Sequence, residues 1–173
     1  MMNELKNTVQ KLLETGNIAG MVKFLKNLAA AGKEAENILD KLYYDGDKAN
    51  AKGVIVLRDG IKSISAEEFK DCKDLQAIVL PESLTYIGEY AFYHCANLSS
   101  VKFPDSLTSI GSGAFRGCTN LTSIKFSCSL NAIYGSAFDN CPIKSIEYYA
   151  RTEPILEYYF GSDWEGFEKT VLD

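Results

Sequence analysis

Histidine is nearly absent from this chain, and its scarcity limits the chemistry that the side chains can perform. The only histidine among the 173 residues is His94. A Cys–His or Ser–His–Asp mechanism would have to be built around it, beside Cys95, but the side chains of sequence neighbours on a turn point apart and no third partner is evident. The sequence also has no Gly-rich phosphate loop and no His-Glu-x-x-His motif. We therefore expect neither enzymatic activity nor a cofactor, and an enzyme that uses His94 is kept as an alternative.

A long hydrophobic run is missing as well. No apolar stretch approaches the roughly 18 residues that a membrane-spanning helix needs. Residues 1–16 distribute their charged side chains through an amphipathic pattern, whereas a secretory signal places a charged segment before an apolar one. We expect a cytoplasmic location for the sequence as it stands, and a secreted or cell-surface location if a leader was removed.

Positive charge is in deficit over most of the chain. Residues 53–173 contain ten Lys and Arg against sixteen Asp and Glu, a balance of −6, while residues 1–52 have a balance of +1 and the whole chain −5. Proteins hold phosphate backbones with clustered basic side chains. The sequence therefore predicts no nucleic-acid partner.

Cysteine occurs five times, but never in the close pairs that zinc sites use. Four of the five recur at intervals of 23 residues, namely Cys72, Cys95, Cys118 and Cys141. In a regularly coiled chain this spacing predicts a column with one cysteine per coil, either as buried thiols or as disulfides between neighbouring coils. Cys128 lies outside the column and is the candidate for an exposed thiol. We expect no metal site.

The same interval of 23 residues governs the apolar positions. Its phenylalanines are Phe69, Phe92, Phe115 and Phe138, and its isoleucines are Ile64, Ile87, Ile110 and Ile133. Leucine and alanine positions keep the same period. A repeat of this length cannot bury its own apolar face, so neighbouring copies must stack into a solenoid.

One copy shows how each coil is built. Leu98, Val101 and Phe103 alternate with polar residues, which predicts a strand that Pro104 ends. Between residues 110 and 118 the apolar spacing is three and four, which predicts a short helical or 3₁₀ turn on the opposite side of the coil. The sequence thus predicts an α/β solenoid, a short right-handed coil with five parallel strands. These strands are expected near residues 54–57, 77–80, 100–103, 123–126 and 145–148.

Two segments resemble the BspA-type leucine-rich repeats of many bacterial and some protozoan proteins. They are residues 84–95, Leu-Thr-Tyr-Ile-Gly-Glu-Tyr-Ala-Phe-Tyr-His-Cys, and residues 107–118, Leu-Thr-Ser-Ile-Gly-Ser-Gly-Ala-Phe-Arg-Gly-Cys. The resemblance covers about residues 53–149 and implies a leucine-rich-repeat solenoid. Members of this family look like recognition proteins, often cell-surface adhesins that bind host proteins. The chain departs from the pattern at Glu68, where the family has Ala, and at Tyr134, where it has Gly.

Two flanking segments complete the domain organisation of 1–52, 53–149 and 150–173. Residues 1–52 contain three short amphipathic helical patterns, which predict a helical N-terminal unit that is either a cap on the solenoid or a separate docking or dimerising unit. Residues 150–173 are aromatic and acidic. They form either a C-terminal cap with buried aromatic rings or, together with Tyr149, a protein-binding patch in which Trp164 is an anchor.

The strand residues that point away from the core define a candidate binding surface. By alternation, the middle column of this face contains Val56, Val79, Lys102, Lys125 and Glu147. The column is either a solvated face or a recognition strip, in which two neighbouring lysines favour an acidic group on the partner. We therefore expect a non-enzymatic module that binds a protein through this face or through the aromatic C-terminus around Tyr149 and Trp164. The alternative is a bacterial cell-surface adhesin fragment that binds host proteins.

Overall fold

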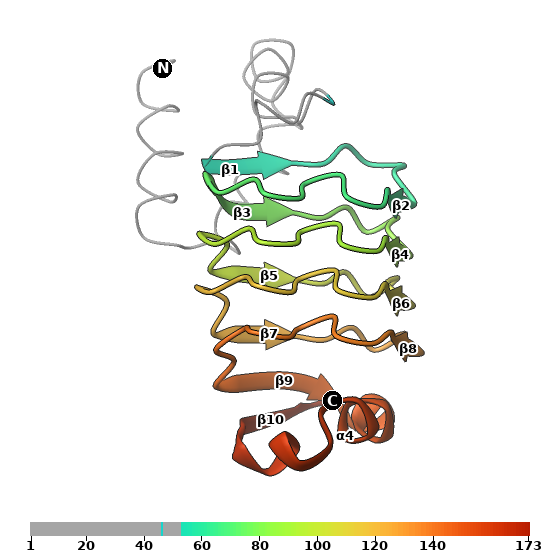
Figure 1. Ribbon diagram of the computed structural model, residues 1–173. Helices are drawn as coiled ribbons and strands as arrows, with labels where there is room; N and C mark the ends of the chain where they lie inside the picture. The colour runs from blue at the N-terminus through green and yellow to red at the C-terminus, as the bar shows by residue number, and fades with distance from the viewer. Residues whose placement is uncertain (1–45, 47–52) are drawn as a thin grey trace, which may run out of the picture.

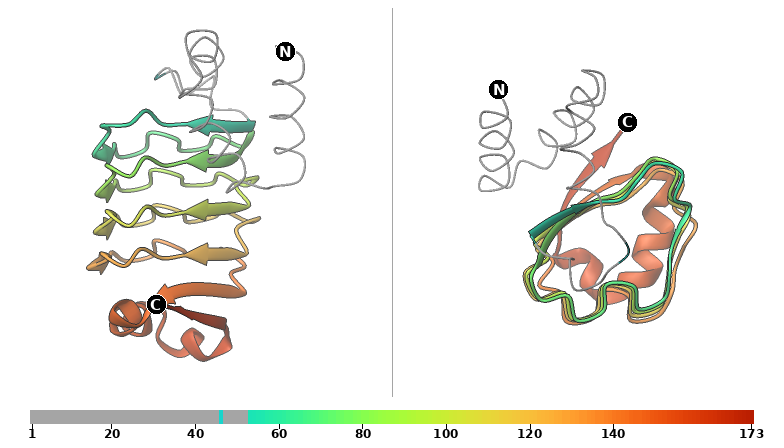
Figure 2. Two further views of the ribbon diagram at one scale, coloured as in Figure 1. Left: turned by 180° about the vertical axis from the view of Figure 1, so that it is seen from behind. Right: turned by 90° about the horizontal axis from the view of Figure 1, so that it is seen from above.

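A computed structural model describes Gly46 and residues 53–173. The helical unit expected for residues 1–52 lies outside these described residues, apart from Gly46. Over residues 53–149 the chain winds into stacked coils, and the coils superimpose in a view along their axis (Figures 1 and 2). The solenoid expected from the 23-residue period is thus observed.

One side of the coils forms a six-stranded parallel sheet. Its order is β1-β3-β5-β7-β9-β10. The strands are β1 (Gly53–Val56), β3 (Leu75–Val79), β5 (Ser100–Lys102), β7 (Ser123–Lys125), β9 (Ser145–Tyr149) and β10 (Glu168–Leu172). The first five fall where the repeat predicts them. The expectation of five strands was wrong, because β10 adds a sixth from the segment that follows the last repeat.

The opposite side of the coils forms a second parallel sheet, which the sequence did not reveal. Its strands are only two residues long: β2 (Ser63–Ile64), β4 (Tyr86–Ile87), β6 (Ser109–Ile110) and β8 (Ala132–Ile133). The isoleucines of β2, β4 and β6 are buried, and they belong to the 23-residue series. A two-residue strand is too short to show alternation, so the period alone could not identify it.

The segment that follows each short strand was predicted as a short helical or 3₁₀ turn, and it forms turns with 3₁₀-type hydrogen bonds but no continuous helix. Lys70 N–H donates to the Glu67 carbonyl at 3.2 Å and Cys72 N–H to the Phe69 carbonyl at 3.1 Å, as in a 3₁₀ helix. However, Glu67 and Asp71 both have positive φ, of 59° and 61°. Left-handed residues at these positions break the segment into separate turns, so no helix propagates.

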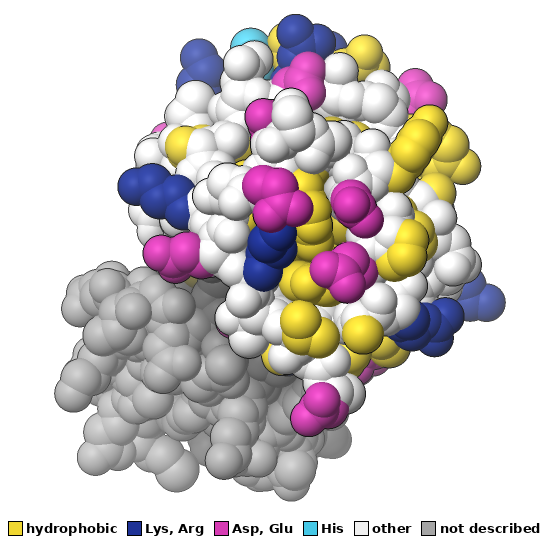
Figure 3. All heavy atoms as spheres, turned by 90° about the horizontal axis from the view of Figure 1, so that it is seen from below, with side chains coloured by type: hydrophobic (Ala, Val, Ile, Leu, Met, Phe, Trp, Pro, Cys, Tyr) yellow, Lys and Arg dark blue, Asp and Glu magenta, His cyan; other side chains and the backbone are white. Residues whose placement is uncertain are grey.

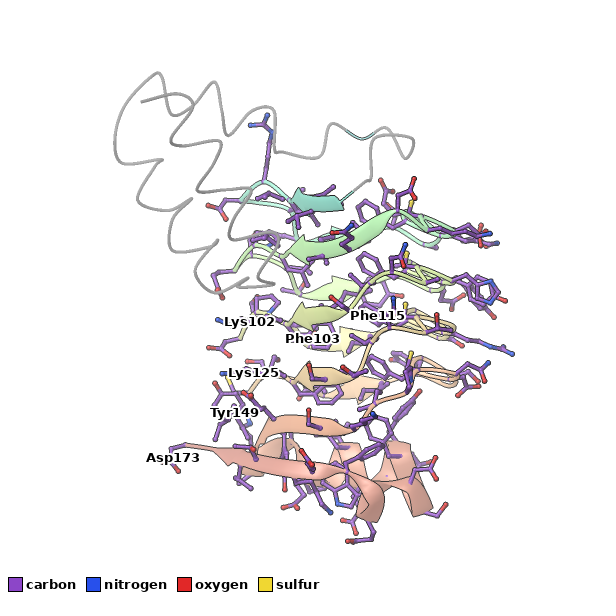
Figure 4. The ribbon with its side chains drawn as sticks, turned by 90° about the vertical axis from the view of Figure 1, so that its left-hand side faces the viewer. Lys102, Phe103, Phe115, Lys125, Tyr149 and Asp173 are labelled. Atoms are coloured by element: carbon purple, nitrogen blue, oxygen red, sulfur yellow. The ribbon has the colours of Figure 1, made fainter. Side chains whose placement is uncertain are left out.

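Aromatic side chains fill the space between the two sheets. The rings of Phe69, Phe92, Phe115 and Phe138 stack at centroid distances of 5.1, 4.9 and 5.3 Å, and their planes lie within 11° of parallel. Phe103 and Phe115 lie in the interior between the sheets (Figure 4). Burying a phenylalanine side chain stabilises a fold by about 1.5–3 kcal/mol, so this ladder is a substantial part of the core.

The C-terminal segment packs against the last coil. It contains a 3₁₀ helix (Ala150–Thr152), α4 (Glu153–Phe160) and a second 3₁₀ helix (Gly161–Gly166) before β10. Pro154 sits in the first turn of α4, where its missing N–H has no partner to lose. The Phe160 ring lies 6.2 Å from Phe138 and 6.3 Å from Phe126, and α4 lies across the end of the coil (Figure 2). The phenylalanine ladder thus continues into α4.

Candidate functional site

The outward column of the main sheet is in the register that alternation predicts. Val56 pairs with Val79, Lys102 with Lys125, and Lys125 with Glu147. Thr170 of β10 pairs with Glu147 and extends the column by one position that the sequence analysis missed. These pairings place Val56 beside Val79, and they bring Lys102, Lys125 and Glu147 side by side.

Two lysines form the charged centre of this column. Lys102 is exposed and Lys125 is half-buried, and neither forms an ion pair within the described part of the chain. Neighbouring strands lie about 4.8 Å apart, so two ammonium groups in adjacent strands repel each other mildly. A negatively charged ligand group placed between them removes that repulsion, which makes this position suited to an anion.

Val56, which was expected in the candidate binding surface, is not exposed. Its side chain is only 7 % exposed, and Val79 is half-buried. Ala77, which also lies on the outward face, is 5 % exposed. Alternation predicts which face a side chain points to, but it does not predict whether that face is covered. The accessible part of the column therefore begins beyond Val56.

Tyr149 lies at the carboxyl end of β9, on the same outward face as Glu147. Lys102, Lys125 and Tyr149 follow one another along one side of the solenoid (Figure 4). Burial raises the pKa of the Tyr149 phenol, and the nearby Asp105 carboxylate raises it further. The half-buried Tyr149 is therefore a neutral hydrogen-bonding group next to the lysine pair.

Trp164 is not available as a binding anchor. Its side chain is 3 % exposed, and its ring packs against Tyr148 at 5.3 Å and Phe160 at 6.5 Å. The Lys169 ammonium lies 4.6 Å from the ring centroid and covers it. In this arrangement the C-terminal segment uses the Trp164 ring to pack on the end of the solenoid, as in the alternative in which residues 150–173 bury their aromatic rings.

His94 lies on the turn opposite the main sheet and is not paired with Cys95. Its ring stacks on Tyr93 at 3.9 Å, and its Nδ1 lies 3.8 Å from an Asp71 carboxylate oxygen. The Cys95 thiol is fully buried and donates to the Phe69 carbonyl at 3.0 Å. The thiol and the imidazole therefore occupy different environments.

The cysteine column consists of free thiols. Cys118 Sγ donates to the Phe92 carbonyl at 3.2 Å and Cys141 Sγ to the Phe115 carbonyl at 3.0 Å, so each thiol bonds to the preceding coil. The hydrogen bond with Cys141, together with burial, raises the pKa of Cys118 far above its ordinary value. Cys128 is half-buried. In the described residues, no group of three His, Cys, Asp or Glu side chains is placed to hold a metal ion.

A groove at the C-terminal end is the feature that sequence reasoning missed. It has a volume of about 790 Å³ and lies between the last coil and α4. The coil contributes Ile133, Gly135, Ser136, Phe138, Asp139, Asn140, Cys141 and Ile143, and the C-terminal segment contributes Tyr158, Tyr159, Phe160, Asp163 and Phe167. The two walls are about twenty residues apart in sequence, and no motif links them.

The repeated strand and turn, the two parallel sheets and the phenylalanine ladder define a leucine-rich-repeat protein. Residues 37–163 match the family described as "BspA type Leucine rich repeat region", with six copies. The chain belongs to this family. The match begins and ends outside the segment 53–149 that the sequence analysis assigned to the repeats.

One solved structure shows the same fold, and a second one is similar in sequence. A leucine-rich repeat protein from Bacteroides ovatus ATCC 8483 is 30 % identical with a TM-score of 0.58, over 69 % of this chain and 30 % of that one. A leucine rich cell surface protein from Faecalibacterium prausnitzii A2-165 is 25 % identical with a TM-score of 0.44, over 66 % and 34 %. This chain thus spans about a third of the length of each of these proteins. A comparison with curated proteins found no match. No helix of the described residues is long and apolar enough to cross a bilayer.

Proposed function

We propose that this chain is a non-enzymatic recognition module that binds a protein partner through the outward face of the main sheet. The observation that carries the proposal is the pairing of Lys102 with Lys125, two ammonium groups on adjacent strands without ion-pair partners in the described residues. Glu147 and Tyr149 add an acid and a neutral phenol to the same face. A partner with a carboxylate opposite the lysine pair fits this arrangement.

A charge-reversal experiment tests the sheet face. The wild-type chain and the Lys102→Glu, Lys125→Glu double variant serve as baits for crosslinking and capture from lysates. The matched control is Lys62→Glu, Lys144→Glu, which makes the same change in net charge at two exposed lysines outside the outward column. We expect a protein that the wild type and the control capture and the double variant does not. Circular dichroism should show the same fold for all three, since exposed charges contribute little to stability.

Two other outcomes count against the sheet face. Equal capture of the same protein by all baits would move the binding site elsewhere on the chain. Unfolding of the double variant would mean that the lysines are structural. The adhesin form of the proposal, in which the partner is a host protein, also requires a signal peptide upstream in the native gene, and reading that gene tests it.

We also propose that the two flanking segments are caps. Contacts of Phe160 with Phe126 and Phe138 support this role for residues 150–173, because they cover rings that the last coil would otherwise leave open. For residues 1–52 the proposal rests on the amphipathic pattern alone. An array of short repeats requires such covers at both ends.

A further inference from the structure

Each coil donates a fixed set of backbone hydrogen bonds to the next one. Around the first turn, the N–H groups of Glu67, Phe69 and Asp71 donate to carbonyls of the following coil at 2.9, 2.7 and 2.8 Å. The following two coils repeat the pattern from residues 90, 92 and 94 and from residues 113, 115 and 117. Three donors per coil therefore point along the solenoid axis toward the C-terminal end.

The last coil has the same three donors but no coil after it. The equivalent residues are Ser136, Phe138 and Asn140. Phe138 N–H donates to the Tyr159 hydroxyl at 2.9 Å, so α4 supplies one replacement acceptor. Within the described residues the N–H groups of Ser136 and Asn140 donate to no protein atom. Their φ angles of 59° and 58° match those of the equivalent residues Glu67 and Asp71, so they keep the donor geometry.

These two donors line the groove between the last coil and α4. Its charged lining residues are Asp139 and Asp163, and no Lys, Arg or His lines it. Tyr158 is 92 % exposed at its rim, and Phe167 is half-buried in its wall. In the view onto the C-terminal end, hydrophobic side chains lie among several acidic ones (Figure 3). The groove therefore combines main-chain donors, aromatic surface and negative charge.

We propose that this groove binds a basic segment of a partner polypeptide. In the preceding coils the equivalent N–H groups donate to main-chain carbonyls, so this geometry selects peptide carbonyls as acceptors. In the groove, carbonyls of the partner accept from the N–H groups of Ser136 and Asn140. A lysine or arginine of the partner lies close to Asp139 and Asp163, and its methylene stem or guanidinium packs on the Tyr158 ring. This site is separate from the lysine pair of the main sheet and does not depend on it.

Titration monitored by NMR tests the proposal on the full chain. The probe is the blocked peptide acetyl-Val-Arg-Val-Arg-Val-amide, and the matched peptide has Glu at both Arg positions. We expect the arginine peptide to move the amide proton signals of Ser136 and Asn140 downfield, as new hydrogen bonds to carbonyls do, while the glutamate peptide leaves them in place. Unmoved signals of both residues at millimolar arginine peptide would overturn the proposal, and so would equal shifts with both peptides.

Charge variants locate the basic side chain. The Asp139→Asn, Asp163→Asn variant should weaken peptide binding about fivefold at low salt, since each exposed ion pair contributes modestly. Glu157→Gln, which removes a charge from α4 outside the groove lining, should leave binding unchanged. The Lys102→Glu, Lys125→Glu variant should also bind the peptide normally, so this experiment tests the groove independently of the proposal for the sheet face. Shifts of Ser136 and Asn140 that follow protein concentration without peptide would show a second copy in the groove and contradict the proposal.

Discussion

At the scale of single residues, two positions in each coil have a left-handed backbone. Tyr90 and His94 occupy them in one coil with φ of 53° and 57°, and Gly113 and Gly117 occupy them in the next. The glycines are required for a second reason. A Cβ at Gly113 would clash with the Tyr90 ring and one at Gly117 with the His94 ring. Aromatic rings in one coil are thus accommodated by the absence of a side chain in the following coil.

Gly117→Ala tests this relation. We expect a loss of about 1–2 kcal/mol in the free energy of unfolding from the left-handed backbone alone, and a further loss from the clash with His94. Denaturant unfolding measures the total. Gly135→Ala is the control, because a Cβ there meets no atom within 4 Å. Adding His94→Ala to Gly117→Ala should recover the unfolding free energy that is lost through the clash, but not the part that is lost through the left-handed backbone. Strict additivity of the two changes would refute the contact between the two positions.

Phe115→Ala tests the aromatic ladder. The ring is fully buried between Phe92 and Phe138 and has an edge contact to Phe103 at 5.6 Å. Its removal leaves a cavity, so we expect a loss of about 3–5 kcal/mol in unfolding free energy, measured by urea titration. Tyr134→Ala removes a ring that is 55 % exposed and should change stability by less than about 0.5 kcal/mol. A loss below about 1 kcal/mol for Phe115→Ala would contradict the packing described here.

At the scale of elements, the sequence predicted what the 23-residue period repeats and missed what occurs once. The positions of β1 to β9 in the main sheet follow from alternation bounded by Pro81 and Pro104. Residues 168–172, Glu-Lys-Thr-Val-Leu, have no periodic partner and only weak alternation, so β10 could not be recognised. Its place is set by tertiary contact, because its backbone pairs with β9 from Ser145 to Tyr149.

For the candidate site, the sequence predicted which strand residues pair with one another, but it did not predict which of them are exposed to solvent. The pairing of Lys102 with Lys125 follows from the period, since residues 23 apart occupy equivalent strand positions. The burial of Val56 and Trp164 depends on which segments pack over them, and a single sequence contains no information about that. The end groove was missed for the same reason: the N–H groups of Ser136 and Asn140 lack acceptors because no further turn of the same kind follows theirs.

Tyr159→Phe tests how α4 is attached to the last coil. The variant leaves Phe138 N–H without its acceptor, so we expect a loss of about 0.5–1.5 kcal/mol and faster hydrogen exchange of the Phe138 amide. Tyr158→Phe is the matched control, because the Tyr158 side chain is 92 % exposed. Unchanged exchange at Phe138 would mean that this hydrogen bond does not hold α4 in place.

The same tyrosine makes stability depend on alkaline pH. Burial, with a smaller contribution from the nearby Asp139 carboxylate, raises the pKa of Tyr159 from its ordinary 10.0 to about 12. The folded state therefore favours the protonated phenol. Its contribution is fully present below pH 10 and is lost as the pH rises toward 12. Unfolding measured across this range should show a smaller loss of stability for Tyr159→Phe than for the wild type, and parallel curves would contradict the assigned burial.

At the scale of the whole molecule, each coil contacts its immediate neighbours, so a disturbance at one end should spread only partway. Phe160 joins the last two core rings, Phe126 and Phe138, to Trp164 and Phe167 of the C-terminal segment. In a linear array, stability is close to a sum of nearest-neighbour interfaces. The C-terminal end therefore has its own local stability.

Phe160→Ala tests this view. Removal of the half-buried ring should speed hydrogen exchange in β9 and β10 by about tenfold or more, which corresponds to about 1.4 kcal/mol of local opening free energy. Exchange in β1 and β3, at the other end of the sheet, should change far less. Uniform acceleration across all strands would show that the chain unfolds as one cooperative unit instead.

The hydrogen bonds between residues 23 apart have a consequence for how such a chain changes over evolutionary time. Thr85 Oγ1 bonds to the Lys62 carbonyl and Thr108 Oγ1 to the Thr85 carbonyl, each across one full coil. The backbone N–H groups of Thr85, Thr108 and Asn131 donate to the same carbonyl positions of the preceding coil, so the main-chain bonding groups repeat from coil to coil. A recombination event that duplicates or deletes one whole copy in frame therefore preserves the pattern of main-chain hydrogen bonds at each junction. The number of coils can therefore change by whole copies, while the segments that flank the repeats stay the same.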